Sequence, residues 1–301
     1  MLALYEFLPF FVLWACYDLR DVEKPLTLTI VIPAYNEESY LKQCLEAISR
    51  QTVMPDEVIV VDNNSTDKTA AIARSFPFVR VMIEKRQGLY HSRQTGMEAA
   101  TTDIIARIDA DTVVDSHWVE TIKEAFTDPA VQALSGPVGY HDMPFPDFVK
   151  KVEDLCLRLA RVGQYEFLMG ANMALRQSAW QLVSDNLCNE PFLFEDIDIA
   201  IHLGEYGISP SYLPTMSATV SSRRFADKPA DFLHYIGGHT RTLEYHEQDT
   251  PAGAHFAEGI FALVYLGIKP FHMIYDPTLR RPSLNYLLTK TEARPDPMSA
   301  E

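Results

Sequence analysis

The feature that most constrains this fold is a regular alternation of strand-like and helix-like segments over residues 27–115. Runs of strand length rich in β-branched residues occupy 27–32, 57–61, 79–83 and 104–108, and helical periodicity occupies 38–50 and 89–100. Because short joins connect these segments, the pattern predicts an α/β protein whose mostly parallel sheet is flanked by helices.

The alternation weakens after residue 115, but no linker-like stretch follows it. Strands are expected at 131–134 and 173–176, and helices at 145–159 and 197–206. We therefore expect residues 116–225 to extend the same sheet rather than to form a separate domain. Residues 226–288 are expected to be a C-terminal helical region, and 289–301 a mobile polar tail.

Polar residues follow three of the predicted strands. The segment PAYNEE (33–38) follows the first strand, Asp62 the second, and Asp109 and Asp111 the fourth. Ligands of open parallel sheets bind beyond the carboxyl ends of the strands. Two carboxylates at i and i+2 of an extended segment point to the same side, where a hard divalent cation would relieve their repulsion. Taken singly, each acid is more typical of a solvated turn residue that caps a helix.

Three segments together carry a family resemblance. IVIPAYNEE (30–38), VVDNNSTD (60–67) and ARIDADT (106–112) resemble the family 2 glycosyltransferases in content, order and spacing. The resemblance covers residues 27–225 and implies a GT-A fold, with a nucleotide-binding half (27–115) and an acceptor half (116–225). It also implies a nucleotide-sugar donor, a divalent cofactor (Mg²⁺ or Mn²⁺) and inversion at the anomeric carbon.

The resemblance also implies roles for individual residues. Donor binding would fall to Pro33, Ala34, Tyr35, Glu37, Asp62, Arg93, Asp109, Gly170, Asn172, Arg223 and Arg224. Asp111 would bind the metal, with Asp109 beside it and His239 as a third candidate ligand. In FLFEDIDIA, Glu195 and Asp196 would be the catalytic acids, Asp196 being the general base and Asp198 its nearest rival.

The chemistry of sugar transfer agrees with these roles. Negative charge builds on the departing diphosphate, where a metal and arginines would neutralise it, while a carboxylate takes the acceptor's proton. The QxxRW motif of processive polysaccharide synthases is absent, so transfer of a single sugar by a hexosyltransferase-type enzyme is expected. The base of the donor (UDP or GDP) and the acceptor (glycan or lipid) stay open.

Two other functions would require different sequence features. A nucleotidyltransferase-like enzyme would carry a glycine-rich loop after the first strand, whereas PAYNEE (33–38) contains no glycine. A non-catalytic nucleotide-sugar-binding module would be expected to have lost Asp111 or Asp196, and both are present. The formal net charge of -15 argues against a nucleic-acid partner, because phosphate binding requires the opposite balance.

The cysteines and the apolar segments bear on the compartment. None of the four cysteines (Cys16, Cys44, Cys156, Cys188) is spaced as CxxC, which favours buried thiols in a reducing cytoplasm over a zinc ribbon. Two apolar segments, 1–17 within an N-terminal hydrophobic region (1–26) and 256–275, either pack on the protein or lie in a membrane interface. Because there are two such segments, peripheral contact of the protein with the inner face of a membrane stays an open alternative.

Overall fold

The computed structural model describes residues 24–159, 168–190, 192–248 and 252–284. The hydrophobic segment 1–17 and the tail 289–301 lie outside these residues, so the predictions made for them are not addressed by the structure.

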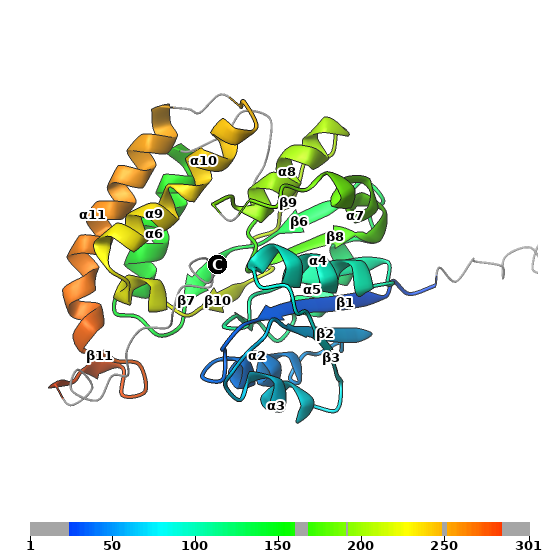
Figure 1. Cartoon of the computed structure of the whole chain (residues 1–301), viewed down its shortest axis with the longest axis horizontal. Coiled ribbons are helices and arrows are strands. Elements are labelled where there is room, and N and C mark those ends of the chain that lie inside the picture. The colour runs from blue at the N-terminus through cyan, green and yellow to red at the C-terminus, as the bar shows by residue number, and fades with distance from the viewer. Residues whose placement is uncertain (1–23, 160–167, 191, 249–251, 285–301) are drawn as a thin grey trace, which may run out of the picture.

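A mixed sheet with the strand order β3-β2-β1-β4-β8-β6-β9 forms the centre of the molecule (Figure 1). Its strands are β1 (Leu28–Ala34), β2 (Glu57–Asp62), β3 (Val79–Ile83), β4 (Ile104–Arg107), β6 (Ala133–Ser135), β8 (Met173–Arg176) and β9 (Ser211–Tyr212). The first four pair in parallel, and only β8 is antiparallel to its neighbours β4 and β6. The predicted mostly parallel sheet is confirmed, and the second half of the chain does extend it.

Helices cover both faces of this sheet. On one face lie α2 (Leu41–Ile48), α3 (Thr69–Arg74) and α5 (Trp118–Ala125), and on the other α4 (Leu89–Ala99), α7 (Gln177–Val183) and α8 (Glu195–Glu205). Successive residues of β1 show the division: Ile30 and Ile32 join the first core and Val31 the second. Because both faces are buried, the strands carry continuous apolar runs.

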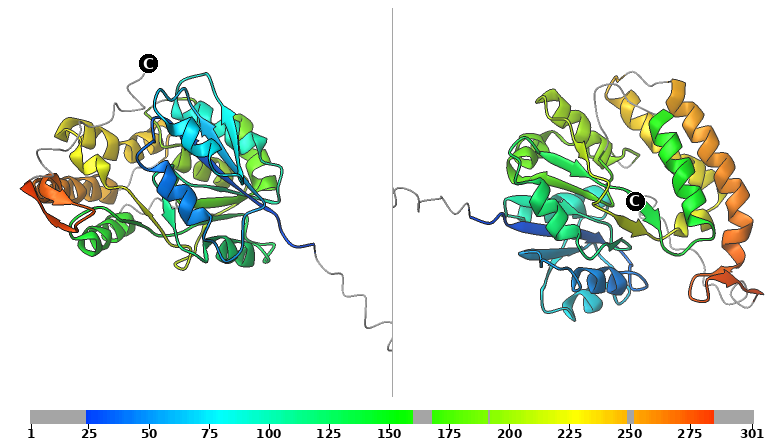
Figure 2. Two further views of the ribbon diagram at one scale, coloured as in Figure 1. Left: turned by 90° about the horizontal axis from the view of Figure 1, so that it is seen from below. Right: turned by 180° about the vertical axis from the view of Figure 1, so that it is seen from behind.

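A layer of four further helices stands beside the sheet (Figure 2). It comprises α6 (Pro146–Leu159), α9 (Pro229–Ile236), α10 (Gly238–Tyr245) and α11 (Ala252–Ile274). It has its own core, in which Phe225, Phe232 and Tyr265 pack together. A small sheet of β5 (Val113–Val114), β10 (Ala218–Val220) and β7 (Val138–Tyr140) lies at the junction. The remaining short elements are the 3₁₀ turns η1 (Ser184–Asn186) and η2 (Arg223–Ala226) and the paired strands β11 (Tyr275–Asp276) and β12 (Arg281–Pro282). The expected C-terminal helices are therefore present.

Gly96 lets α4 approach the sheet closely. A methyl group there would lie 2.4 Å from Val31 Cγ1 and 2.9 Å from Val61 Cγ2. We expect Gly96→Ala to lower the free energy of unfolding by about 1–3 kcal/mol through overpacking, as measured by urea denaturation. Gly259→Ala is the matched control, since nothing lies within 4 Å of that position in α11, and helix propensity should raise stability there by up to ~1 kcal/mol. Equal stabilities of Gly96→Ala and wild type would contradict this account of the packing.

Candidate active site

The sequence-predicted donor residues gather at one edge of the sheet. Pro33 and Ala34 end β1 and are followed by Tyr35 and Glu37, Asp62 ends β2, and Asp109 and Asp111 follow β4. The paired register of Ala34 with Asp62 sets the first two loops side by side. Asn36, with a φ of 53°, joins them: its N–H donates to Ser65 Oγ at 3.0 Å, and its Oδ1 accepts from Thr66 N at 2.8 Å.

Asp62 presents an unsatisfied acceptor at this edge. The residue is 4% exposed, and its Oδ1 is buried without a hydrogen-bond partner. A buried polar atom left unpaired costs about 1–3 kcal/mol, which an N–H group of a ligand would recover. The position therefore fits the predicted contact with the base of a nucleotide.

Glu37, Asp111 and Arg223 form a charged cluster beside it. Arg223, from η2, binds Glu37 through both nitrogens, at 2.7 and 2.9 Å, and its Nη2 lies 3.0 Å from Asp111 Oδ2. Burial raises the pKa of Asp111 to about 7; Arg223 opposes this, while the charges of Asp109 and Glu37 add to it. One guanidinium thus balances only part of the negative charge of three neighbouring carboxylates.

That imbalance suits a divalent cation. Mg²⁺ and Mn²⁺ prefer carboxylate oxygens and complete their shells with water and substrate phosphates. Asp111 and the more exposed Asp109 would supply those oxygens, and a cation beside Asp111 would favour its ionised form.

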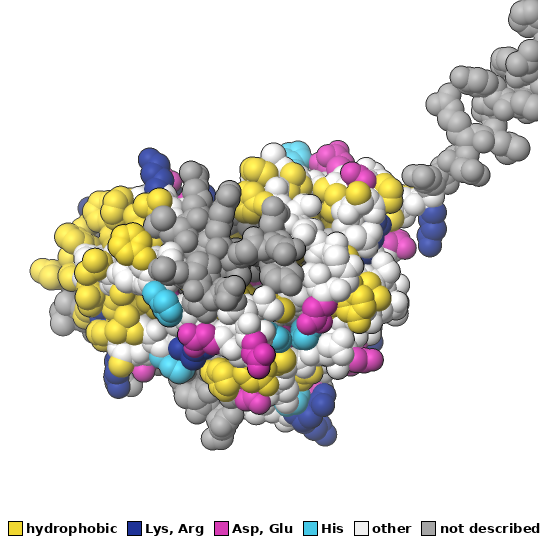
Figure 3. Space-filling view, turned by 90° about the horizontal axis from the view of Figure 1, so that it is seen from above, with side chains coloured by type: hydrophobic (Ala, Val, Ile, Leu, Met, Phe, Trp, Pro, Cys, Tyr) yellow, Lys and Arg dark blue, Asp and Glu magenta, His cyan; other side chains and the backbone are white. Residues whose placement is uncertain are grey.

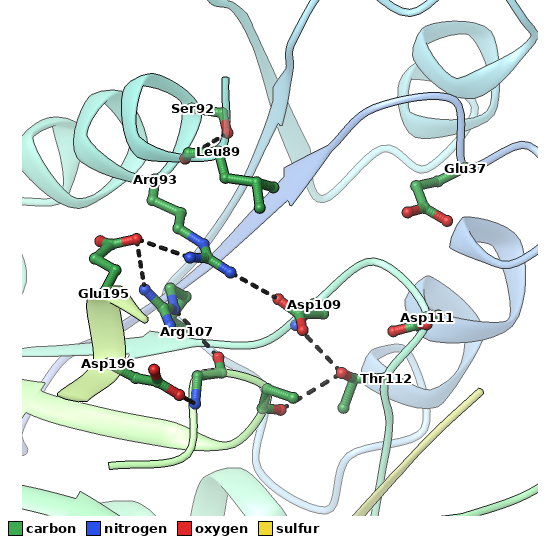
Figure 4. Close-up of polar contacts among 12 residues, drawn as sticks. Glu37, Leu89, Ser92, Arg93, Arg107, Asp109, Asp111, Thr112, Glu195 and Asp196 are labelled. Carbon is green, nitrogen blue, oxygen red and sulfur yellow. Dashed lines mark hydrogen bonds and ion pairs between the residues drawn. The ribbon is translucent and has the colours of Figure 1, made fainter. Parts of the chain in front are cut away.

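A second cluster joins three elements around Glu195 (Figure 4). Glu195 Oε2 lies 3.0 Å from Arg93 Nη1 of α4 and 3.2 Å from Arg107 Nη1 of β4. Arg93 also lies 4.0 Å from Asp109, which links this cluster to the acids after β4. Arg107 is completely buried, and none of the sequence motifs indicated it. A charged residue inside an otherwise apolar strand was the available signal.

Asp196 lies at the first turn of α8, where a helix N-terminus favours a carboxylate. Its Oδ2 accepts a hydrogen bond from Gly170 N at 2.7 Å, and Gly170 O accepts one from Arg107 Nε at 3.1 Å. A Cβ on Gly170 would lie 2.2 Å from Arg107 Nη2, so a larger residue there would displace the buried Arg107 guanidinium. The half-buried Asp196 is thereby held beside the Glu195 cluster.

Asn172 is not available to a donor, contrary to the prediction. It is completely buried, its Oδ1 accepts from Trp118 Nε1 at 2.8 Å, and its Nδ2 donates to the carbonyls of Met216 and Pro137. Because both ends of the amide are used inside the protein, Asn172 supports the loop after Gly170 instead of contacting a ligand.

Asp198 is likewise not a rival base. It is completely buried on α8 and bonds to the backbone N–H of Cys188 and to His246 Nε2, away from Gly170 and Arg107. The side chain therefore has no path to an acceptor hydroxyl beside Asp196.

Arg224 and His239 lie on the side of the helical layer. The Arg224 guanidinium stacks 3.8 Å from the centre of the Tyr235 ring. Burial lowers the pKa of His239 to about 4, and the charge of Asp196 opposes that shift. A neutral imidazole is the form that binds metals. The donor role of Arg224 and the metal role of His239 stay predictions.

Known proteins resemble parts of this chain. Glycosyltransferase AglE of Haloferax volcanii is 34% identical over 120 residues, which cover 38% of this chain and 40% of that protein. The O-antigen chain rhamnosyltransferase RfbN of Salmonella typhimurium is 24% identical over 201 residues, covering 62% of this chain and 64% of that protein. The matches thus span less than two thirds of either relative.

A solved structure with a similar fold and a protein-family model also match this chain. The mannosyltransferase PcManGT of Pyrobaculum calidifontis, solved with GDP-Man and Mn²⁺, superposes with a TM-score of 0.60 at 19% identity, covering 83% of this chain and 75% of that one. The model of the family described as glycosyl transferase family 2 matches residues 29–180. This match takes in all three motifs that predicted the family, and the chain belongs to glycosyl transferase family 2.

Proposed function

We propose that this protein is a metal-dependent, inverting glycosyltransferase that moves one sugar from a nucleotide-sugar donor to an acceptor hydroxyl. The observation that carries the proposal is the arrangement of charges at the sheet edge. Acids that suit a cation (Asp109, Asp111) lie on one side of Arg93, and the carboxylate suited to a base (Asp196) lies beyond it with Glu195.

The donor would lie along β1, β2 and β4. Asp62 would accept a hydrogen bond from the base, and Arg93 and Arg223 would lie beside the diphosphate. A divalent ion held by Asp111 and Asp109 would neutralise the charge that builds on the leaving oxygens. PcManGT, which shares this fold, was solved with GDP-Man and Mn²⁺, and that supports a donor and a metal of these classes here.

The acceptor would approach from the side of Asp196. Its hydroxyl oxygen attacks the anomeric carbon, the bond from that carbon to the diphosphate breaks, and Asp196 takes the hydroxyl proton. A single displacement inverts the anomeric configuration and leaves a nucleoside diphosphate. Glu195, neutralised by two arginines, is a positioning residue rather than a second base.

The test is a donor screen. Wild-type protein is incubated with UDP- and GDP-sugars, with Mn²⁺, Mg²⁺ or EDTA, and release of the nucleoside diphosphate is measured with and without candidate acceptors. We expect metal-dependent turnover with one class of donor and, once an acceptor is found, an inverted product by NMR. Release of pyrophosphate from a nucleoside triphosphate and a sugar phosphate would instead establish a nucleotidyltransferase. A failure to hydrolyse or transfer any donor that nonetheless binds would indicate a binding module.

The helical layer suggests where the acceptor comes from. Among the described residues one helix, spanning Gly253–Ile274, is long and apolar enough to cross a membrane. Only 22% of its most apolar 18-residue stretch is buried inside the protein. Phe256, Leu263 and Leu266 are 63%, 70% and 54% exposed, and Phe148 of α6 is 54% exposed. Figure 3 shows hydrophobic side chains gathered on the side of the molecule where α11 lies in Figure 1. We propose that this face rests on a membrane surface and that the acceptor is lipid-linked.

Liposome flotation tests the contact. Each buried leucine contributes about 1.5–3 kcal/mol, so Leu263→Glu with Leu266→Glu should reduce vesicle binding by more than about 100-fold. Leu182→Glu, at an exposed leucine of α7 on the sheet, is the control and should float like wild type. Wild-type protein that stays at the bottom with both neutral and anionic vesicles would contradict the proposal without affecting sugar transfer.

A further inference from the structure

Four side chains with metal-binding atoms converge outside the donor site. They are Cys188, which follows η1, Asp198 and His202 of α8, and His246, which caps the C-terminus of α10. One ligand atom from each lies within 4.8 Å of all the others. Asp198 and His202 are buried and the other two half-buried, so the cluster is largely shielded from water but not sealed.

The separations are close to those of a tetrahedral site. Asp198 Oδ1 lies 2.6 Å from His246 Nε2 and 3.5 Å from His202 Nε2, and Cys188 Sγ lies 3.8 Å from His246 Nε2. Ligands at ~2.0–2.3 Å from a zinc ion stand about 3.3–3.7 Å apart along the edges of the tetrahedron. Of these three distances, the one between Asp198 and His246 is shorter, because it is a hydrogen bond that an ion would open by about 1 Å.

His202 provides independent evidence for a ligand. Its Nε2 is buried and makes no hydrogen bond, although it faces Asp198. Its other nitrogen, Nδ1, lies 3.1 Å from Glu205 Oε2. This is the arrangement of metal-binding histidines in general, whose second nitrogen donates to a carboxylate that fixes the ring. Asp198 is held in the same manner, since its Oδ2 accepts from Cys188 N at 2.9 Å.

A nucleophilic relay through His246 does not explain the cluster. A Cys–His–Asp relay uses one imidazole nitrogen for the thiol and the other for the carboxylate. Here the same atom, His246 Nε2, faces both Cys188 Sγ and Asp198 Oδ1. Convergence of three groups on one point is the geometry of coordination instead.

We propose that Cys188, Asp198, His202 and His246 bind one transition-metal ion, best fitted by Zn²⁺. Thiolate and imidazole donors favour zinc over Mg²⁺ or Mn²⁺, which prefer oxygens, so this site and the acids after β4 select different ions. A thiolate, a carboxylate and two neutral imidazoles also balance a divalent charge completely. With four protein ligands the ion is structural.

The ion would hold in place the N-terminal part of α8, which carries the proposed catalytic acids. Its ligands come from the loop before α8, from α8 itself and from the end of α10, and α8 carries Glu195 and Asp196 in its first turn. The metal site would therefore position these residues without touching a substrate.

Metal analysis and cobalt spectroscopy test the site. Full-length protein is stripped with chelator, reloaded with Zn²⁺ or Co²⁺ and desalted. We expect one tightly held equivalent, together with the intense visible bands of tetrahedral Co²⁺ and an ultraviolet thiolate-to-cobalt band. Asp111→Asn should retain all three signals, because it alters only the donor site. Octahedral cobalt spectra without a thiolate band would overturn the proposal.

Variants exclude adventitious binding. Cys188→Ser should abolish the thiolate band, and His202→Gln or His246→Gln should lower zinc affinity by at least about 10–100-fold. His255→Gln, at an exposed histidine of α11, is the matched control and should bind like wild type. Zinc should raise the melting temperature of wild type and not that of His202→Gln. Equal zinc binding by Cys188→Ser, His202→Gln and His255→Gln would disprove the site, and this result is independent of any transferase assay.

Discussion

Asp196→Asn is expected to lower kcat by about 10²–10⁴-fold, the usual cost of removing a general base. The amide is nearly isosteric, and its oxygen can still accept the short hydrogen bond from Gly170 N. Only the longer bond from Ile197 N to Oδ1 is given up, so the loop and α8 should keep their positions. It cannot take the acceptor proton at neutral pH. Donor and metal affinity should survive, because Asp196 lies beyond Arg93 from the acids after β4. Single-turnover transfer and donor titration measure the two effects separately.

Three comparisons make this experiment specific. Asp231→Asn, at an exposed carboxylate of α9, should retain wild-type turnover. Glu195→Gln should lose less kcat than Asp196→Asn but more stability, since it leaves Arg93 and Arg107 without their shared carboxylate. Asp198→Asn should weaken zinc binding. A dead Asp198→Asn enzyme beside an active Asp196→Asn enzyme would show that the base had been assigned to the wrong acid.

Asp111→Asn is expected to abolish transfer and to weaken Mn²⁺-dependent nucleotide binding. Loss of a direct ligand should exceed the ~10–100-fold effect of losing a supporting partner. The Arg223–Glu37 pair does not need Asp111, so the loop geometry should persist and metal-free nucleotide binding should change little. Calorimetric titration of UDP and GDP, with and without Mn²⁺, measures the difference.

The control is a carboxylate far from the site. Asp147→Asn, exposed in the first turn of α6, should leave nucleotide affinity as in wild type. If Asp111→Asn and wild type bind the preferred nucleotide equally well in the presence of Mn²⁺, Asp111 does not hold the metal.

The first half of the fold could be predicted because its strands are buried on both faces. Such strands show as continuous apolar runs, and β2, which is buried from Val58 onward, begins at Glu57 where the pattern placed it. The short helices α5 and α7 were missed, since each gives only about two turns of periodicity, whereas α2 lies within a longer periodic pattern at 38–50. The antiparallel direction of β8 is set by its neighbours β4 and β6, which local sequence does not report.

The candidate site likewise contains residues that the sequence predicted and residues that it did not. Acids at strand ends were found because topology brings the ends of β1, β2 and β4 together. Arg107 and the cluster around Asp198 could not be predicted in this way, because their partners come from distant segments of the chain. His246, for example, is 48 residues from Asp198. The i, i+4 spacing of Asp198 and His202 on one helix was the single local hint. Asn172 was misassigned because sequence gives a residue's place in a motif but not its burial.

Arg223 connects the helical layer to the proposed donor site. It lies two residues from Phe225, which is central to the core of that layer, while its guanidinium holds Glu37 and Asp111. The same short turn therefore belongs to two structures at once. If the layer loosens, the acids lose their counter-charge, and whatever binds those acids acts back on the layer with equal free energy. If the donor binds as proposed, its occupancy and the order of the helical layer are therefore expected to be thermodynamically linked, so that donor binding favours an ordered acceptor surface.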